Sequence, residues 1–424
     1  GLGVRAMGAA LRSASVDHVI GSRAGLLAAR AGRVPGTRFS TEALPTAPGG
    51  TPLPEVHAQM PAAVLFTSGA TGPAKGVLYR HGQARAQVEL VRTTYALGDD
   101  DRFVAAFAPF AILGPALGVA SAVPAIDVTK PATLTAVALA EAAQAVQATV
   151  VFAAPAALRT VLATASALDA AGAGALATVR LLVSAGAPVP ASLLRSLASV
   201  LPLAQCHTPY GMTECLPVTD VSLAQLEEAG PGDGVCVGWP LPGVELALSA
   251  LSELGVADGE LSTAPGVTGE ICVRAEHMKD SYDALWATER AASRNPGWHR
   301  TGDVGHLDAE GRLWVSGRTL HVVSTAHGVL TPVGVEQRVE EVRSPAAVVG
   351  VGPVGTQQVV VVLAGGGDVL ADAATTDAVR AAAGVDVAAV LVRKELPVDI
   401  RHSSKIDRVA LARWAEGVLA GGRA

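Results

Sequence analysis

The sequence predicts an α/β fold in which a large N-terminal domain of stacked α/β subdomains precedes a small α+β C-terminal domain. Half of the 424 residues are hydrophobic but only 4% are aromatic. Alanine and valine must therefore fill the core, which favours α/β layers over an aromatic-rich β fold. Short apolar runs alternate with helix-like segments, a pattern that indicates parallel strands joined by helical crossovers. The chain is long enough for one large and one smaller domain.

Shifts in composition define the first elements. Residues from about 37 to 61 are rich in Pro, Gly and Thr, which is typical of a loop. The apolar run at 62–66 is expected to be a buried strand that leads into a glycine-rich loop. Further strand-length apolar runs lie at 149–152, 179–183 and 271–273, and we expect them to be parallel strands.

The stretch from 103 to 126 contains no charged residue and is long enough to cross a membrane. Pro109, Pro115 and Pro124 interrupt it, so a continuous helix is not expected there. The sequence therefore predicts no transmembrane segment. We interpret the stretch as a buried wall around an apolar pocket, although a plain core role fits the same residues.

The C-terminal part has its own alternation of elements. The run at 311–318 is expected to be a strand that ends in a turn, and a compact βα-like tail follows it. Its expected strands and helix lie at 346–349, 359–364, 376–383 (the helix) and 387–392. We therefore predict a domain boundary that separates residues 1–318 from residues 319–424.

Charge and cysteine content exclude several classes of function. The formal net charge of −6 argues against nucleic acid as a partner. The four cysteines form no CxxC pair and have no histidine at zinc spacing. We expect them to be reduced thiols of a cytoplasmic protein, and no signal peptide is expected.

Two glycine patterns resemble dinucleotide-binding loops without the required context. Residues 350–355 match GxGxxG after a strand, but a second β-rich run follows instead of the helix that would hold a pyrophosphate. Residues 172–177 follow a helix-like segment rather than a strand. Both are expected to be turns.

The most informative local motif is the hydroxyl- and glycine-rich loop from Thr67 to Gly76. Glycines let the backbone approach an anion closely, and free N–H groups can form a nest around it. Hydroxyl side chains add donors and Lys75 adds charge, so a polyphosphate is the expected ligand. The loop is not a Walker A motif, because Ala74 and Gly76 flank the lysine where that motif requires Gly and Ser or Thr.

Further motifs follow downstream in a fixed order. They are Ser184-Ala185-Gly186-Ala187-Pro188, Thr208-Pro209-Tyr210-Gly211-Met212-Thr213-Glu214, Thr301-Gly302-Asp303, Gly317-Arg318 and Ser403-Ser404-Lys405. Each has a plain alternative when taken alone. A Thr-Gly-Asp triplet is usually a β-turn, and an isolated Glu or Lys is usually a solvated surface residue.

Together these motifs resemble the adenylate-forming superfamily, which comprises acyl-CoA synthetases, nonribosomal adenylation domains and luciferases. The resemblance implies an AMP-forming ligase with ATP and Mg²⁺ as cofactors. It implies that Lys405, on a mobile C-terminal lid, bridges the substrate carboxylate and the α-phosphate. It also implies catalytic roles for Thr213 and for Glu214, with Glu214 as the magnesium ligand. The implied ATP-binding residues are Thr67, Ser68, Gly69, Thr71, Gly72, Lys75, Gly186, Ala187, Pro188, Tyr210, Gly211, Asp303 and Arg318.

Less general stretches narrow the resemblance to the β-lactone synthetases of bacterial olefin and β-lactone pathways. These stretches lie at 76–81, 214–218, 283–288, 295–303, 331–337 and 398–402. For that family the implied reaction converts ATP and a long-chain β-hydroxy acid to a β-lactone, AMP and pyrophosphate. The substrate's own hydroxyl captures the acyl adenylate, and a positioned internal nucleophile can reach effective molarities of ~10⁵–10⁸ M. His81, Phe110 and His299 are the candidate substrate-side residues, and no base for the hydroxyl is assigned.

Two departures bear on the use of coenzyme A. Thr319-Leu320-His321 stands where acyl-CoA synthetases carry a charged hinge, and Thr325-Ala326-His327-Gly328 replaces a lysine-bearing turn. Both weaken the coenzyme A alternative. A long-chain acyl-CoA synthetase or acyl-AMP ligase remains one alternative, and a non-catalytic nucleotide-binding module remains another.

The resemblance also implies partners and extent. A β-hydroxy fatty acid is the expected small-molecule partner. A membrane-peripheral assembly with other enzymes of the same lipid pathway is expected by family analogy only. The family carries far more sequence before the phosphate loop, so we expect the large domain to be N-terminally incomplete here.

Overall fold

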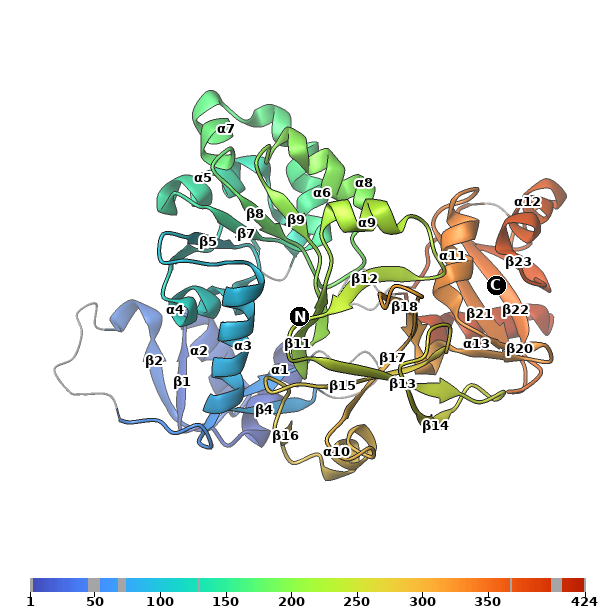
Figure 1. Cartoon of the computed structure of the whole chain (residues 1–424), viewed down its shortest axis with the longest axis horizontal. Helices are drawn as coiled ribbons and strands as arrows, with labels where there is room; N and C mark the ends of the chain where they lie inside the picture. Colours follow the sequence, from blue (N-terminus) through green and yellow to red (C-terminus); the bar gives the residue numbers. More distant parts are fainter. Residues whose placement is uncertain are drawn as a thin grey trace.

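The computed structural model describes residues 3–44, 54–67, 74–127, 130–366, 368–397 and 406–422. A five-stranded parallel sheet organises the N-terminal half (Figure 1). Its strands, in spatial order, are β6 (Ala120–Ala122), β5 (Arg102–Ala105), β7 (Val150–Phe152), β8 (Leu181–Val183) and β9 (Gln205–His207). The parallel strands expected near 150 and 180 are confirmed.

Helices cover both faces of this sheet, as parallel sheets require. On one face, α5 (Ala136–Val146), α6 (Pro155–Ala163) and α8 (Ala191–Ser196) pack against one inward-facing residue of each of four strands, namely Val104, Val151, Leu182 and Cys206. On the other face, α3 (His81–Thr94) and α4 (Leu113–Leu117) pack against the flanking residues. Every residue of β7 and β8 is buried, which explains their continuous apolar sequence.

An eight-stranded antiparallel sheet lies beside the parallel one. Its strands, in spatial order, are β10 (Tyr210–Met212), β11 (Cys215–Asp220), β12 (Val235–Pro240), β18 (Leu313–Arg318), β17 (His299–Leu307), β15 (Gly269–Arg274), β13 (Glu245–Leu251) and β14 (Ala257–Ser262). The expectation of a parallel strand at 271–273 is wrong, because β15 is antiparallel to both neighbours. Burial on both faces produces the same apolar run in either direction, so the sequence signal did not distinguish them.

A small sheet joins distant parts of the chain. β16 (Ser281–Tyr282) pairs with β4 (Gly76–Arg80), which pairs with β3 (Pro61–Phe66), all antiparallel. The expectation that the run at 62–66 is buried is wrong. β3 is an edge strand whose residues are exposed or half-buried, because it has β4 on one side only.

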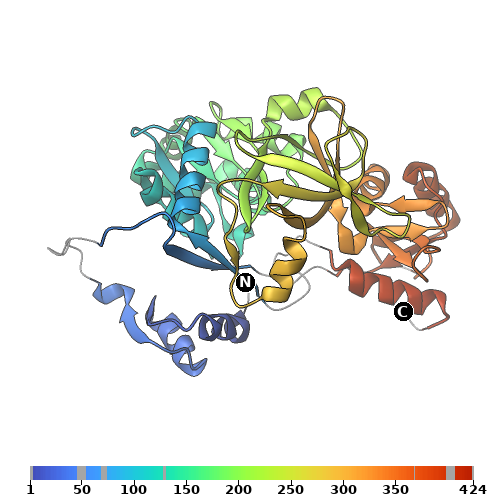
Figure 2. The same ribbon diagram turned by 60° about the horizontal axis from the view of Figure 1, so that its bottom comes forward.

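The N-terminal segment forms α1 (Gly3–Ser13), β1 (His18–Gly21), α2 (Arg23–Ala31) and β2 (Thr37–Ser40). β1 and β2 make a two-stranded parallel sheet of their own. Figure 2 shows this segment to one side of the large sheets. The loop expected from residue 37 therefore begins with a strand and a 3₁₀ turn, Thr41–Ala43.

The C-terminal part forms a separate three-layer unit around the sheet β21 (Ala346–Val351), β22 (Gln358–Ala364) and β23 (Ala389–Arg393). Helices α11 (Pro332–Glu340) and α12 (Ala373–Ala383) pack on one face of it. Helix α13 (Arg408–Leu419) packs on the other. The strands and the helix expected in this tail are present, whereas the domain boundary at Arg318 stays a prediction.

The two glycine patterns behave differently. Gly350 and Val351 end β21, and residues 352–355 lie in the turn to β22, so this pattern reaches a turn as expected. The turn expected at 172–177 is wrong, because these residues belong mostly to α7 (Ala170–Leu176). Asp169 caps this helix by accepting a hydrogen bond from the N–H of Gly172, and that local capping outweighs the low helix propensity of glycine.

All four cysteines are buried and free. Within the part of the chain that the structure describes, no helix is long and apolar enough to cross a membrane. The stretch from 103 to 126 instead contains β5, a 3₁₀ turn, α4 and β6, so its prolines and glycines interrupt it as expected.

A buried ion pair joins β15 to β17. The guanidinium of Arg300 donates to the carboxylate of Glu270, and their side chains are only 5% and 12% exposed. Arg300 also donates to the carbonyl of Ala257, and Glu270 accepts from the N–H of Gly302. The pair thereby fixes the part of β17 that precedes Asp303, where Thr-Gly-Asp is part of a strand rather than the usual β-turn.

We predict that Arg300→Met lowers the free energy of unfolding by about 3–5 kcal/mol, because it leaves a buried carboxylate without its cation. Chemical denaturation measures this loss. The matched control is Arg274→Met, which breaks an exposed pair with Glu245 between neighbouring strands and should change stability little. Equal effects of the two substitutions would contradict the prediction.

Candidate active site

The turn between β10 and β11 consists of Thr213 and Glu214 and is held by three hydrogen bonds. The hydroxyl of Tyr79, on β4, donates to the carbonyl of Thr213 at 2.7 Å. The backbone N–H of Lys279 donates to the carbonyl of Glu214 at 2.7 Å. The hydroxyl of Tyr282, on β16, donates to Oε1 of Glu214 at 2.6 Å. The small sheet therefore fixes both the backbone and the carboxylate of this turn.

Two lysines lie against the ring of Tyr282. Nζ of Lys279 is 4.5 Å and Nζ of Lys75 is 5.3 Å from the ring centroid, so both make cation–π contacts. Lys279 is buried and forms an ion pair with Glu289, at 2.6 Å. Burial and the nearby Glu214 carboxylate raise the pKa of Tyr282 far above its usual value. The phenol therefore keeps its proton and acts as a donor to Glu214.

His299 lies behind this cluster and is 3% exposed. Its ring centroid is 6.3 Å from that of Tyr282, and its buried Nδ1 has no hydrogen-bond partner among the described residues. Burial, together with the positive charges of Lys279 and Lys75, lowers the pKa of His299 to about 3. The imidazole is therefore neutral at physiological pH.

A second cluster lies on β10, β17 and β18. The hydroxyl of Tyr210 donates to Oδ2 of Asp303 at 2.8 Å, and Nε of Arg318 lies 3.0 Å from Oδ1. Asp303 and Arg318 are cross-strand neighbours in the β17–β18 pair. The structure thus brings these three residues together, although Tyr210 and Arg318 are more than 100 positions apart in the sequence.

Of the other predicted nucleotide residues, three lie on the loop after β8, and Gly211 lies within β10. Gly186, Ala187 and Pro188 follow β8, and Gly186 has a φ of +98° that favours glycine. A side chain at Gly211 would come within 2.9 Å of the carbonyl of Cys215, so only glycine fits there. Ser184, at the start of the loop, has a buried hydroxyl without a partner among the described residues.

The predicted phosphate loop is described only at its ends. Thr67 donates its N–H to the carbonyl of Lys75 at 2.9 Å, which closes the loop between β3 and β4. Ser68, Gly69, Thr71, Gly72 and Lys405 lie outside the described residues.

The two remaining substrate-side candidates lie on different elements. His81 is the first residue of α3, and its N–H donates to the carbonyl of Met60 at 3.0 Å. Phe110 lies in the 3₁₀ turn Ala108–Ile112 and packs on Phe107 and Phe152, with ring centroids 5.1 Å and 4.5 Å apart. Phe110 is therefore part of an aromatic cluster at the end of β7.

Sequence reasoning missed Tyr79, Lys279 and Tyr282. Their roles depend on contacts with Thr213 and Glu214 across at least 65 residues of chain, so no local spacing announces them. The sequence of β4 offered one signal. Val77 and Tyr79 are two residues apart and so lie on the same face of a strand, and both are buried.

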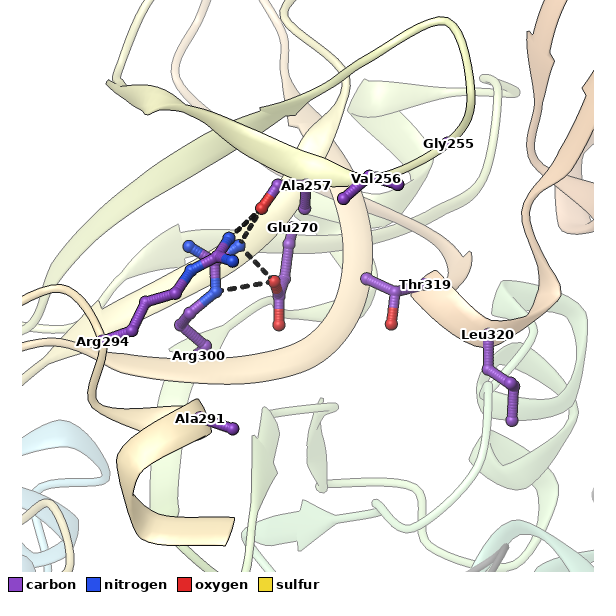
Figure 3. A pocket seen from close by; sticks show the side chains of 9 residues that line it. All are labelled: Gly255, Val256, Ala257, Glu270, Ala291, Arg294, Arg300, Thr319 and Leu320. Atoms are coloured by element: carbon purple, nitrogen blue, oxygen red, sulfur yellow. Dashed lines mark hydrogen bonds and ion pairs between the residues drawn. The ribbon is translucent and has the colours of Figure 1, made fainter. Parts of the chain in front are cut away.

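A surface cavity of about 410 Å³ lies elsewhere, between β14, α10 (Trp286–Ala292) and the segment after β18 (Figure 3). Its polar lining residues are Glu270, Arg294, Arg300 and Thr319. Arg300 is already paired with Glu270, and Arg294 donates to the carbonyl of Ala257. None of the predicted nucleotide residues lines this cavity.

The donor set around Glu214 fits a magnesium ion that is held partly by its substrate. Among the described residues, no three His, Cys, Asp or Glu side chains gather to hold a metal by themselves. Mg²⁺ in phosphate-handling enzymes uses one or two carboxylates together with phosphate oxygens and water. The single, oriented carboxylate of Glu214 is therefore sufficient for such an ion.

Comparison with known proteins identifies the class to which this fold and site belong. Residues 8–282 match the AMP-binding enzyme family, so the chain belongs to the adenylate-forming enzymes. It is 37% identical over 395 residues to the olefin beta-lactone synthetase of Stenotrophomonas maltophilia, an alignment that covers 88% of this chain and 70% of that protein. It is also 37% identical over 390 residues to the olefin beta-lactone synthetase of Xanthomonas campestris, covering 86% and 69%.

The fold is shared with solved structures of this class. O-succinylbenzoate coenzyme A synthetase from Bacillus subtilis, in complex with ATP and magnesium ion, superimposes with a TM-score of 0.75 and 19% sequence identity. The match covers 96% of this chain and 82% of that chain. At this identity the likeness concerns the fold alone.

We predict that His299 makes the protein acid-sensitive. Its folded pKa of about 3 lies below the value of about 6.5 in an unfolded chain, so its contribution to stability is complete above pH 6.5 and is lost as the pH falls toward 3. The unfolding midpoint of the wild type should fall between pH 7 and pH 4, and His299→Gln should make this fall smaller. His327→Gln, at an exposed histidine, serves as the control. Parallel pH profiles for wild type and His299→Gln would refute the prediction.

Proposed function

We propose that this chain is an ATP-dependent β-lactone synthetase. It would adenylate a long-chain β-hydroxy acid and close the acyl adenylate to a β-lactone, with release of AMP and pyrophosphate. The observation that carries the proposal is 37% identity, over 88% of the chain, to proteins named for this activity. The clamped Glu214 turn and the Tyr210–Asp303–Arg318 cluster support an adenylating site in the same chain.

The nucleotide would lie across the strand ends of the two large sheets. We propose that the ring of Tyr210 faces adenine, with the segment 186–188 opposite it. Asp303 would hold the ribose, because a carboxylate has about four acceptor sites and Tyr210 and Arg318 leave some of them available. The polyphosphate would bind the loop of Thr67, Ser68, Gly69, Thr71, Gly72 and Lys75, with a further contact from Thr213.

Magnesium would bind at Glu214, where it would neutralise charge on the phosphates. The residues of this chain do the remaining work. In the first step an oxygen of the substrate carboxylate attacks the α-phosphorus and pyrophosphate leaves. Two anions must meet, so we propose that Lys75 and Lys405 screen and position them.

The second step forms the lactone ring. The β-hydroxyl oxygen attacks the acyl carbonyl, the bond from that carbonyl to the phosphate oxygen of AMP breaks, and the hydroxyl proton must pass to a base. The aromatic cluster of Phe107, Phe110 and Phe152 supports a pocket for the alkyl chain next to this reaction. We also propose that residues 319–424 act as a lid that brings Lys405 to the nucleotide.

One experiment separates the candidate functions. The chain is incubated with ATP, Mg²⁺ and a long-chain β-hydroxy acid, with and without coenzyme A, and the products are identified by mass spectrometry. A lactone formed without coenzyme A supports the proposal. A thioester formed only with coenzyme A identifies an acyl-CoA synthetase, and nucleotide binding without turnover identifies a non-catalytic module.

We predict that Lys405→Ala and Glu214→Ala each reduce ATP–pyrophosphate exchange by about 10²–10³-fold. The first substitution removes a positioned positive charge, and the second removes the proposed ligand of the magnesium ion that would supply one. Lys130→Ala, at an exposed lysine, is the control and should leave exchange unchanged. Near-normal exchange in either active-site variant would remove that residue from the mechanism.

We predict a smaller effect for Tyr282→Phe, which removes the hydroxyl that orients Glu214. Loss of a group that orients a metal ligand typically costs about 10–100-fold in metal affinity or activity. The Mg²⁺ concentration for half-maximal exchange should rise, and direct titration of nucleotide-loaded protein with Mn²⁺ should show the same weakening. An unchanged Mn²⁺ affinity would show that the hydrogen bond is merely structural.

A further inference from the structure

An oriented histidine lies at the end of the parallel sheet, outside the residues assigned above. His207 is the last residue of β9, and its Nδ1 lies 2.6 Å from Oδ2 of Asp220 on β11. The hydroxyl of Tyr95, which follows α3, donates to Oδ1 of the same carboxylate at 3.0 Å. The Tyr95 ring also meets the imidazole edge-on, with centroids 5.6 Å apart. One oxygen of Asp220 therefore contacts the imidazole, while the hydrogen bond from Tyr95 holds the other oxygen in place.

This arrangement defines which nitrogen is available. Nδ1 faces a carboxylate, so it carries the proton and Nε2 is the acceptor in the neutral ring. Among the described residues, no hydrogen bond to Nε2 is found, and the side chain is 20% exposed whereas Asp220 is 9% exposed. A buried carboxylate that orients a more accessible imidazole is the arrangement of a general base.

The strand register places His207 beside the proposed alkyl pocket. Cys206 packs on the α5–α6 face of the sheet, so the next residue must face α3. In the sheet register, Phe152 pairs with Val183 and Val183 pairs with His207. These three side chains make a row along the carboxyl edge of the sheet, and the row begins at the aromatic cluster.

The nucleotide segments begin at the same edge. Thr208 and Tyr210 follow His207 by one and three residues, and Gly186 follows β8 by three residues. The N–H of Ser184 donates to the carbonyl of His207 at 2.9 Å, which joins the two loops. Ligands of open α/β sheets bind outside the carboxyl ends of the strands. An acid whose chain lies along Phe110 and Phe152 would therefore pass His207 on its way to the adenylate.

We propose that His207, oriented by Asp220, is the base that accepts the β-hydroxyl proton during ring closure. This inference rests on the proposed function. As the hydroxyl oxygen forms its bond to the acyl carbonyl, the lone pair of Nε2 takes the proton and AMP leaves with the electrons of the broken C–O bond. The Asp220 carboxylate stabilises the imidazolium, which later releases its proton to solvent.

A purely structural role for the pair is the competing explanation. However, the backbone already joins this region to the end of β11, because the N–H of Thr208 donates to the carbonyl of Val221 at 2.9 Å. His207 and Ser222 also form a β-bridge. The His207–Asp220 contact is therefore not needed to hold these two segments together. A test of its role must measure the two half-reactions separately.

The test measures both half-reactions for wild type, His207→Gln and Asp220→Asn. Adenylation is followed by ATP–pyrophosphate exchange with the β-hydroxy acid, and ring closure is followed by single-turnover formation of the lactone. We expect both variants to retain exchange within about threefold. Lactone formation should fall by about 10²–10⁴-fold, the usual contribution of a general base. The acyl adenylate should accumulate in its place.

Two controls make the result decisive. His306→Gln removes a histidine that stacks on Trp314 and should leave both half-reactions unchanged. In His207→Ala, added imidazole should restore part of the lactone formation. Equal loss of exchange and lactone formation in both variants, or lactone formation at the wild-type rate, would overturn the role of His207. A wild-type chain that exchanges pyrophosphate but forms no lactone would overturn the proposed function, and this inference with it.

Discussion

The two-residue turn between β10 and β11 depends on a single short strand. β4 begins at Gly76, where the predicted phosphate loop ends, and three residues later Tyr79 holds the carbonyl of Thr213. The same strand pairs with β16, which supplies the hydroxyl that orients Glu214. The predicted phosphate loop and the carboxylate are therefore linked through two tyrosine side chains, which are held on strands that pair with each other. A site that must hold both ends of a polyphosphate benefits from such pre-organisation, because little order has to be gained on binding.

Charge around this turn is arranged unevenly. Lys279 is paired with Glu289 and contributes little net charge, whereas the contact found for Lys75 is the ring of Tyr282. His299 adds none, because its burial keeps it neutral. On the function proposed above, Lys75 would be the cation of this cluster that meets an incoming anion, whereas the ion pair of Lys279 would mainly hold the floor of the site in place.

The sequence predicted those parts of the site that depend on local spacing. The segments around Thr208–Glu214 and Thr301–Asp303 were recognisable because their residues lie next to each other in the chain, and the structure brings Tyr210 and Asp303 into contact. Contacts between Tyr282 and Glu214 could not be predicted, since they depend on how β16 pairs with β4. The strand at 271–273 shows a related limit, because burial fixes which residues are apolar but not the direction of the neighbouring strand.

The four buried cysteines bear on the chemistry of the proposed product. Burial raises the pKa of Cys215 to about 12 and that of Cys272 to about 11, and it also raises the pKa of Cys206 and Cys236. The thiolate is the reactive form of cysteine, and little of it is present when burial raises the thiol pKa in this way. A β-lactone is a strained electrophile that acylates accessible thiolates. On the function proposed above, the enzyme would release a reactive acylating agent while keeping its own sulfur nucleophiles protonated and out of reach.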